Sequence, residues 1–197
     1  MRASASRLSS PTAGVAATER AFSETPPARL YLDTNVVLDA LIQTRPRHAR
    51  VAALIRHLYE SGLTTLYVSS LTWVEYGHIV VSEGLRALLP AETRDRFHLD
   101  AWDSSAVRAA YMADMVSKFE ALLNQFPWVE LPIGPGIRRH ALELMPQYAL
   151  KGNDAAHLAS ALQAEVYDLA SFDKAFRKVD GLYLWNDLIH AEPAAHA

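Results

Sequence analysis

Short runs of strand-forming residues alternate with helical patterns along most of this chain. Expected strands lie at residues 29–32, 64–68, 128–133, 166–170 and 182–184. Between them, apolar residues recur at helical spacing. Strands that alternate with helices form a parallel sheet whose crossover helices cover both faces. The sequence therefore predicts an α/β fold with three layers, α/β/α, around a central parallel sheet of four to five strands.

The length and composition predict one domain with flexible ends. Of 197 residues, 50% are hydrophobic, which suffices for one well-buried core. Residues 1–28 are rich in Ala, Ser, Thr and Pro, and we interpret them as a disordered extension or the result of a start codon assigned too early. A transit peptide is the alternative, although Glu19 and Glu24 weaken it. The domain then spans residues 29–190, with a flexible tail at 191–197.

The segment between the second and third expected strands is long and charged. Residues 90–126 keep a helical pattern of apolar positions. We predict that they form a helical hairpin, with aromatic residues such as Tyr111 and Phe119 among the buried ones.

Several classes of protein are excluded by composition. The chain has no cysteine, so disulfides, zinc ribbons, iron–sulfur clusters and thiol nucleophiles are ruled out, and the expected compartment is the cytoplasm. No run of 18 or so apolar residues predicts a membrane span. A formal charge of -3 argues against a surface that is basic throughout, although a local basic rim remains compatible with it.

Four acidic residues lie where strands meet helices or where helices begin, namely Asp33, Glu75, Asp154 and Asp173. Ligands of parallel α/β sheets bind beyond the carboxyl ends of the strands. Carboxylates gathered there repel one another unless cations lie among their oxygens, and Mg²⁺ and Mn²⁺ prefer such hard oxygen ligands. The pattern predicts a divalent metal site.

Ordinary structural roles also fit these residues when each is taken alone. Asp33, Asp154 and Asp173 are each suited to cap a helix. Asp39 and Asp103 are interpreted as solvated surface charges. His157 lies on the apolar side of its expected helix and is interpreted as a packed, hydrogen-bonded histidine.

Four segments together resemble the motifs of PIN-domain ribonucleases, and within that superfamily the toxins of VapBC toxin–antitoxin modules. They are residues 31–39 (YLDTNVVLD), 69–75 (SSLTWVE), 153–161 (NDAAHLASA) and 169–176 (LASFDKAF). The four motifs come in the family's order and on the expected elements, and the resemblance spans residues 30 to about 185. Ser171 stands where the family more often has threonine, and the stretch between the second and third motifs is longer than in compact toxins.

The resemblance implies a fold, a reaction and a set of site residues. The fold would be PIN-like, and the reaction would be cleavage of single-stranded RNA with inversion at phosphorus and a 5′-phosphate product. Asp33, Asp154 and Asp173 would bind Mg²⁺ or Mn²⁺, and Glu75 would bind metal or orient the attacking water. Asn35 and Ser171 would hydrogen-bond to the ligands or to water.

The resemblance also implies partners, namely a VapB-like antitoxin and a second copy of the chain in a homodimer. Candidate RNA contacts are Arg45, Arg47, Lys151 and Lys174, which flank the motifs, although ordinary surface charge explains them equally well. Two other functions remain open. One is a catalytically silent PIN fold that binds RNA or protein, and the other is a nuclease that acts on DNA ends or flaps.

Overall fold

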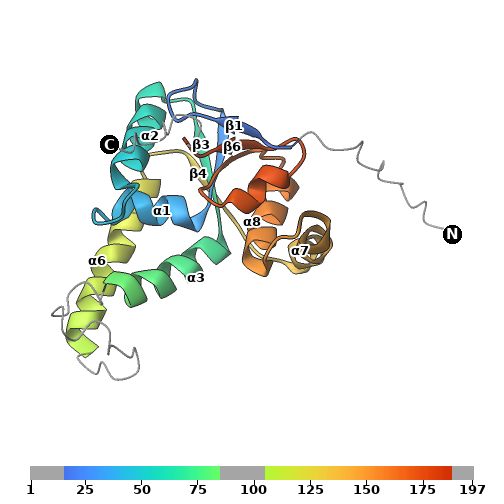
Figure 1. The fold of residues 1–197 in the computed structure, drawn as a ribbon. Helices are drawn as coiled ribbons and strands as arrows, with labels where there is room; N and C mark the ends of the chain where they lie inside the picture. Colours follow the sequence, from blue (N-terminus) through green and yellow to red (C-terminus); the bar gives the residue numbers. More distant parts are fainter. Residues whose placement is uncertain (1–15, 85–104, 188–197) are drawn as a thin grey trace, which may run out of the picture.

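A computed structural model of the protein describes residues 16–84 and 105–187 (Figure 1). The strands are β1 (Thr18–Arg20), β2 (Arg29–Leu32), β3 (Thr65–Ser69), β4 (Trp128–Leu131), β5 (Asp168–Ala170) and β6 (Tyr183–Trp185). The helices are α1 (Thr34–Leu41), α2 (His48–Ser61), α3 (Ser70–Ile79), α6 (Ser105–Leu123), α7 (Pro135–Tyr148) and α8 (Gly152–Gln163). A π-helical turn, η1 (Val80–Gly84), extends α3, and a short 3-10 helix, η3 (Lys174–Lys178), precedes β6.

All strand pairs in the sheet are parallel, in the order β1-β6-β5-β2-β3-β4. The chain leaves β2 toward β3 on one side, and β5 later pairs with the other side of β2. The strand order therefore reverses at β2, and ligands of open parallel sheets bind at such a reversal, beyond the carboxyl ends of the strands. Asp33 directly follows β2 at this point.

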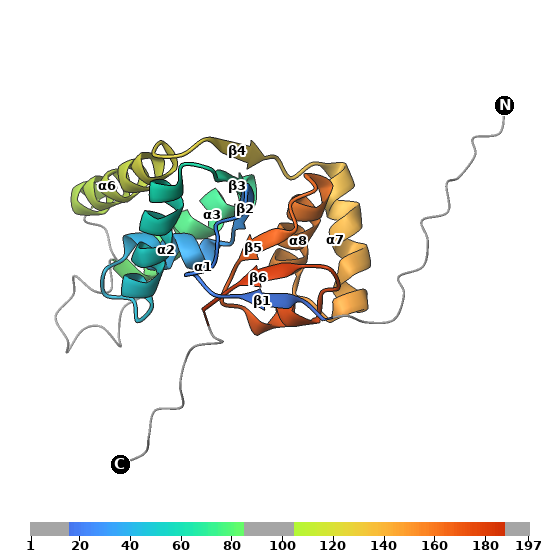
Figure 2. The same cartoon turned by 90° about the horizontal axis from the view of Figure 1, so that it is seen from above.

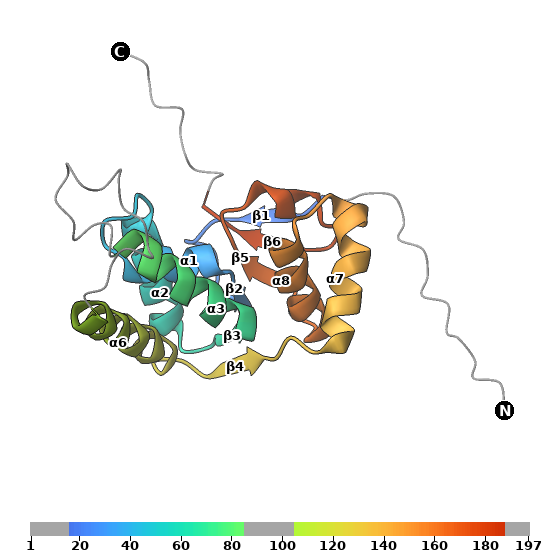
Figure 3. The ribbon, with the colours of Figure 1, turned by 90° about the horizontal axis from the view of Figure 1, so that it is seen from below.

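Helices cover both faces of the sheet, as predicted. Helices α1, α2, α3 and α6 lie on one side, and α7 and α8 lie on the other (Figure 2). The view from below shows the same division (Figure 3). Each face has its own core, and alternate side chains of β2 serve the two, since Leu30 and Leu32 pack into the first and Tyr31 into the second. The three-layer α/β/α fold is confirmed, with six strands in place of four to five.

The additional strand corrects our interpretation of the N-terminal segment. Residues 1–28 were expected to be an extension outside the domain, yet Thr18–Arg20 form β1 and pair with β6 from Thr18↔Tyr183 to Arg20↔Trp185. Next to β1, Phe22 is 5% exposed and packs edge-on against Phe172. The sheet and an aromatic contact thus hold this part of the chain to the domain. Residues 1–15 and 188–197, including the expected tail, lie outside the described residues.

Local sequence signals fix the ends of several helices. Ser69 caps α3 through a capping box, because its side chain accepts a hydrogen bond from the Thr72 backbone N–H and the Thr72 hydroxyl accepts one from the Ser69 N–H. Gly62 ends α2 in the left-handed conformation, with φ of 63°. Pro135 begins α7, where its missing N–H costs no helical hydrogen bond.

The second half of the expected hairpin is a single long helix, α6. Phe119 of α6 is fully buried and stacks near Trp73 and Tyr76 of α3, and the Tyr76 hydroxyl donates to the Met115 carbonyl. This packing holds α3 against the rest of the fold. The first half of the hairpin falls on residues 85–104, outside the described part. No helix in residues 16–84 and 105–187 combines the length and apolar character needed to cross a membrane.

Candidate metal-binding active site

The site begins where β2 and β5 end side by side. Leu32 pairs with Ala170, and the next residues, Asp33 and Ser171, meet through their side chains. The Ser171 hydroxyl donates to Asp33 Oδ2 at 2.5 Å, and Asn35 Nδ2 donates to the same oxygen at 2.5 Å. Parallel pairing therefore places two residues that are 138 positions apart in direct contact.

Glu75 reaches the same place from α3. Its Oε2 accepts hydrogen bonds from the Thr34 hydroxyl at 2.5 Å and from His157 Nε2 at 2.8 Å. Its Oε1 accepts one from Asn153 Nδ2 at 2.7 Å. Three donors from two other helices thus fix this carboxylate, whose side chain is 20% exposed.

His157 is buried at the centre of these contacts. Its Nδ1 lies 2.8 Å from the Tyr31 hydroxyl, and its Nε2 lies 3.8 Å from Asp33 Oδ1. The expectation of a packed, hydrogen-bonded histidine is confirmed, since the residue is 1% exposed. Ligand atoms of Asp33, Glu75 and His157 all lie within 4.8 Å of one another. The histidine therefore faces the acidic cluster as well as the core.

Asp154 lies in the first turn of α8, but Lys151 occupies the N-cap position of that helix. The buried Oδ2 of Asp154 has no hydrogen-bond partner among the described residues. Asp33 stands at the N-cap of α1, and its side chain makes no capping hydrogen bond there. Capping therefore explains neither residue.

Asp173 does cap a helix. Its Oδ1 accepts a hydrogen bond from the Ala175 backbone N–H at 2.8 Å, at the start of η3. Its own N–H donates to the Ser171 hydroxyl, which in turn donates to Asp33. One oxygen of Asp173 is thus used by the backbone, and the residue is linked to Asp33 through Ser171.

The carboxylates influence one another's charge. Burial raises the pKa of Asp154, and the negative charges of Asp173 and Asp33 raise it further. Burial also raises the pKa of Asp33, against the opposing effects of His157 and the Ser171 hydrogen bond. The charges of Asp173 and Asp33 thus act on Asp154, and that of Glu75 acts on Asp33, although the described group whose ligand atoms lie within 4.8 Å of one another contains neither Asp154 nor Asp173.

The pKa shifts of Glu75 and His157 each favour the charged form of the side chain. Burial opposes ionisation of Glu75, but hydrogen bonds from His157, Thr34 and Asn153 outweigh it and lower the pKa of Glu75. Burial likewise opposes protonation of His157, but the hydrogen bond to Glu75 and the charge of Asp33 raise the pKa of His157. When protonated, His157 offsets part of the negative charge of the site.

A divalent cation fits the carboxylate oxygens that remain available as ligands. Asp154 Oδ2 is buried without a partner, and its charge is opposed by two neighbouring carboxylates. A buried anionic oxygen without a donor is costly unless a cation or proton compensates it. Oxygen ligands of this kind suit Mg²⁺ or Mn²⁺, and neither a thiolate nor a ring of imidazoles is present in the described site.

The structure corrects the interpretation of Asp39. It was expected to be a solvated charge, but its side chain is 0% exposed and lies between two arginines. Arg45 Nε is 2.6 Å from its Oδ1, and Arg47 Nε is 3.0 Å from its Oδ2. The periodicity of α1 could not reveal this, because both partners lie in the loop that follows the helix. Asp103 lies outside the described residues.

The four candidate RNA contacts differ in environment. Lys151 and Lys174 are exposed at the beginning of α8 and η3, next to Asp154 and Asp173 in the chain. Arg45 and Arg47 are ion-paired with Asp39 and have side chains 18% and 39% exposed.

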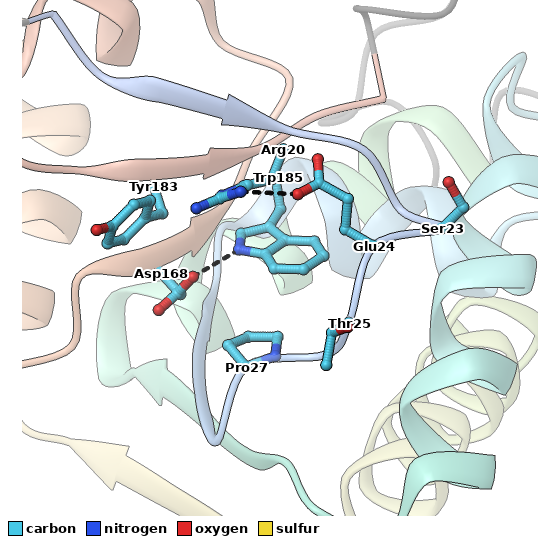
Figure 4. Close-up of a pocket in the computed structure, with 8 residues that line it drawn as sticks. All are labelled: Arg20, Ser23, Glu24, Thr25, Pro27, Asp168, Tyr183 and Trp185. Carbon is cyan, nitrogen blue, oxygen red and sulfur yellow. Dashed lines mark hydrogen bonds and ion pairs between the residues drawn. The ribbon is translucent and has the colours of Figure 1, made fainter.

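A separate pocket of about 630 Å³ lies beside β1, β5 and β6 (Figure 4). Four of the side chains that line it form two hydrogen-bonded pairs, Arg20 with Glu24 and Trp185 with Asp168. Arg20 bonds to Glu24 and lies 5.0 Å from the Tyr183 ring centroid, and Trp185 Nε1 donates to Asp168. The pocket contains none of the four acids, and the contacts between its lining residues stabilise the fold.

Sequence reasoning missed four supports of the site, namely Thr34, Asn153, the Tyr31 hydroxyl and the contact between His157 and Glu75. Three of them had a usable signal. Asn153 directly precedes Asp154. Thr34 directly follows Asp33, and His157 follows Asp154 by three positions, which places both on one face of a helix. The Tyr31 hydroxyl that orients His157 had none, because a buried strand tyrosine is an ordinary core residue.

The sequence and the fold are similar to those of known proteins. The family model of the PIN domain matches residues 30–182. The chain belongs to the PIN domain family. The expected resemblance is thereby confirmed for the family and its fold, and the four motifs all lie within the matched PIN domain.

Individual relatives of this PIN domain protein are distant. Ribonuclease VapC6 of Methanocaldococcus jannaschii is 22% identical over 154 residues, which covers 78% of this chain and 94% of that protein. Two solved structures are also similar. A crystal structure of VapBC2 from Rickettsia felis bound to a DNA fragment from their promoter has a TM-score of 0.49 and 15% identity, covering 80% of this chain and 98% of that one. A toxin–antitoxin complex from Klebsiella pneumoniae has a TM-score of 0.48 and 18% identity, covering 80% and 97%.

Proposed function

We propose that this PIN domain protein is an endoribonuclease that requires Mg²⁺ or Mn²⁺ and cleaves single-stranded RNA. The observation that carries the proposal is the buried, unpartnered Oδ2 of Asp154, in a site where the charges of Asp173 and Asp33 oppose its ionisation. Such a cluster is stable in ionised form when it holds a cation. Membership of the PIN domain family and similarity to a ribonuclease over most of both chains support the reaction.

Asp33, Asp154 and Asp173 are the residues that we assign to the metal, with Glu75 either as a further ligand or as the group that orients the attacking water. When bound, a divalent ion would make water nucleophilic near neutral pH and stabilise charge on the phosphate oxygens. In the hydrolysis, a water oxygen bonds to phosphorus and the bond from phosphorus to the 3′-oxygen breaks. The products are a 3′-hydroxyl and a 5′-phosphate, with inversion at phosphorus.

The chain's own groups give this reaction its geometry. Ser171 and Asn35 both donate to Asp33 Oδ2, which leaves Oδ1 available for a ligand. Thr34, His157 and Asn153 hold Glu75 ionised and fixed, so that it can accept a hydrogen bond from water. Lys151 and Lys174 are exposed beside the acids and are suited to neutralise the RNA backbone.

We further propose that the protein is the toxin of a type II pair and works in the cytoplasm. The support is its similarity to Ribonuclease VapC6 and the four motifs that resemble VapBC toxins. Its partners would be a VapB-like antitoxin and a second copy of the same chain. Co-purification with the product of a short neighbouring gene, followed by light scattering of the free and bound protein, tests both partners.

The direct test is RNA cleavage by the purified protein. Wild-type protein should cleave a single-stranded RNA in Mg²⁺ or Mn²⁺ and lose activity in EDTA, and Asp33→Asn should reduce kcat by about a thousandfold or more. Glu143→Gln, an exposed carboxylate on α7, is the matched control and should leave kcat unchanged. Equal cleavage by wild type and Asp33→Asn would refute the assignment.

The same assay separates the alternatives. A catalytically silent PIN fold that binds RNA or protein predicts no cleavage and no metal binding that depends on the carboxylates. A nuclease for DNA ends or flaps predicts preference for a branched DNA over single-stranded RNA. The presence of all four acids, Asp33, Glu75, Asp154 and Asp173, favours the enzyme.

A further inference from the structure

The buried ion-pair cluster of Asp39, Arg45 and Arg47 lies at the other end of α1 from Asp33. Asp39 is the sixth residue of this helix, and both arginines come from the loop between α1 and α2. One carboxylate faces two guanidinium groups, with Arg45 Nε 2.6 Å from Oδ1 and Arg47 Nε 3.0 Å from Oδ2. Arg45 Nε also donates a hydrogen bond to Oδ1, so one arginine already orients Asp39 and the second is available for another role.

The second arginine, Arg47, connects this cluster to the acidic site. Its guanidinium carbon lies 4.3 Å from the centroid of the Phe172 ring. Phe172 stands between Ser171 and Asp173, and its backbone N–H donates to Asn35 Oδ1 at 3.2 Å. Arg47 is thus stacked on the residue that separates two members of the active site.

The contacts of Arg47 leave part of its guanidinium for a ligand. Its Nε faces Asp39 Oδ2, and one face of the group covers Phe172, while 39% of the side chain is exposed. No described residue hydrogen-bonds to either Nη nitrogen, and the planar fork that they form matches two oxygens of a phosphate. Arg45 is more enclosed, with 18% of its side chain exposed, and serves to hold Asp39.

We infer that Asp39 positions Arg47 as a subsite for an RNA phosphate that flanks the scissile one. This inference rests on the proposed ribonuclease function and adds a specific group for substrate binding. Asp39 is a positioning residue, because it acts on RNA through Arg47. The ion pair and the stacking on Phe172 fix the guanidinium before RNA binds, so little side-chain entropy is lost on binding.

The first test replaces Arg47 and measures steady-state cleavage of a short single-stranded RNA at several KCl concentrations. Arg47→Ala should raise KM about tenfold at low salt with kcat changed by less than about twofold, and should make the slope of log affinity against log salt about 0.7 shallower. Arg47→Lys keeps the charge but loses the planar fork, so its KM should lie between that of wild type and that of Arg47→Ala. Arg139→Ala, which removes an exposed arginine from α7, should match wild type.

The second test concerns Asp39. Asp39→Asn should raise KM as Arg47→Ala does, and the double variant should be no worse than Arg47→Ala alone, because both changes remove one subsite. Losses that multiply in the double variant would overturn the positioning role. If Asp39→Asn does not fold, the comparison of Arg47→Ala, Arg47→Lys and Arg139→Ala decides the subsite by itself.

A purely structural ion pair gives a different result. In that case Arg47→Ala would lower Tm but leave KM and the salt slope equal to those of Arg139→Ala, and the subsite would be refuted. Failure of the proposed function is distinguishable, since wild type would then cleave no RNA in either metal. Fluorescence anisotropy of the same RNA would still decide the subsite, because equal binding by wild type and Arg47→Ala would contradict it.

Discussion

At the scale of single residues, one buried oxygen sets the electrostatic character of the site. Asp154 Oδ2 lacks a donor in the described structure, and burial together with the charges of Asp173 and Asp33 raises the pKa of Asp154. In the proposed function, this carboxylate would oppose folding at neutral pH without metal and would stabilise the fold as a ligand of a bound ion.

Asp154→Asn should therefore stabilise the metal-free protein while removing its response to metal. A neutral amide relieves the repulsion, so Tm in EDTA should rise by roughly 2–4 °C for about 1 kcal/mol gained. Wild type should gain about 2.7 kcal/mol at Mn²⁺ concentrations one hundred times the dissociation constant, and the variant should gain much less. Thermal unfolding with EDTA and with Mn²⁺ measures both, with Glu143→Gln as control. A variant that is less stable than wild type in EDTA would contradict this account.

The pH dependence of stability should also change with metal. The pKa values of Asp33, Asp154 and His157 are raised by folding, so their contribution is present at low pH and is lost as pH rises through the raised values. The pKa of Glu75 is lowered, so its contribution is present above its ordinary value of 4.5 and is lost below it. In EDTA we expect a higher Tm at pH 6 than at pH 8.5.

Mn²⁺ should remove or reverse that difference, because the ion competes with protons for the same carboxylates. Melting curves at the two pH values, with and without Mn²⁺, provide the comparison. A Tm in EDTA that increases from pH 6 to pH 8.5 would show that these groups do not dominate.

Residue environments were the part of the site that sequence alone could least reveal. The acids themselves stood out by their position at strand ends, but Asp39 looked like an ordinary surface charge. Its partners, Arg45 and Arg47, are brought to it by the turn after α1, and a turn has no periodicity to analyse. The contact between His157 and Glu75 joins two helices and depends on how they pack.

At the scale of elements, β1 shows where composition misled. Its three residues, Thr18, Glu19 and Arg20, are polar and follow a low-complexity segment, so they carry no apolar alternation. The strand forms because β6 offers it an open edge, with Thr18 N–H donating to the Leu182 carbonyl at 2.8 Å. Strands rich in apolar and β-branched residues, such as β2 and β3, were predicted within one or two residues.

The segment after β1 should contribute to stability as a core element does. Phe22→Ala removes a ring that is 5% exposed and contacts Phe172, so unfolding in urea should show a loss of about 3–4 kcal/mol. Leu142→Ala, which truncates a side chain that is 67% exposed on α7, is the control and should change stability by less than about 0.5 kcal/mol. A loss for Phe22→Ala as small as for the control would mean that this segment does not belong to the folded unit.

At the scale of the whole molecule, the sheet topology explains why distant acids meet. Strands β2 and β5 are neighbours at the point where strand order reverses, so Asp33 and Ser171 contact each other. Helices α3 and α8 then bring Glu75 and Asp154 to the same end of the sheet from opposite layers. The alternation of strands and helices in the sequence predicted that the acids lie at this end of the sheet. The hydrogen bonds within the site could not be predicted from the sequence, because they depend on how the helices pack.

We propose that Asp33, Glu75, Asp154 and Asp173 form one binding site for divalent ions. Calorimetric titration of the metal-free protein with Mn²⁺ tests it most directly. We predict saturable binding by wild type and by Glu143→Gln, and a loss of at least tenfold in affinity for Asp33→Asn and for Asp154→Asn. Wild-type protein that binds no Mn²⁺, or variants that bind it as tightly as wild type, would contradict the claim.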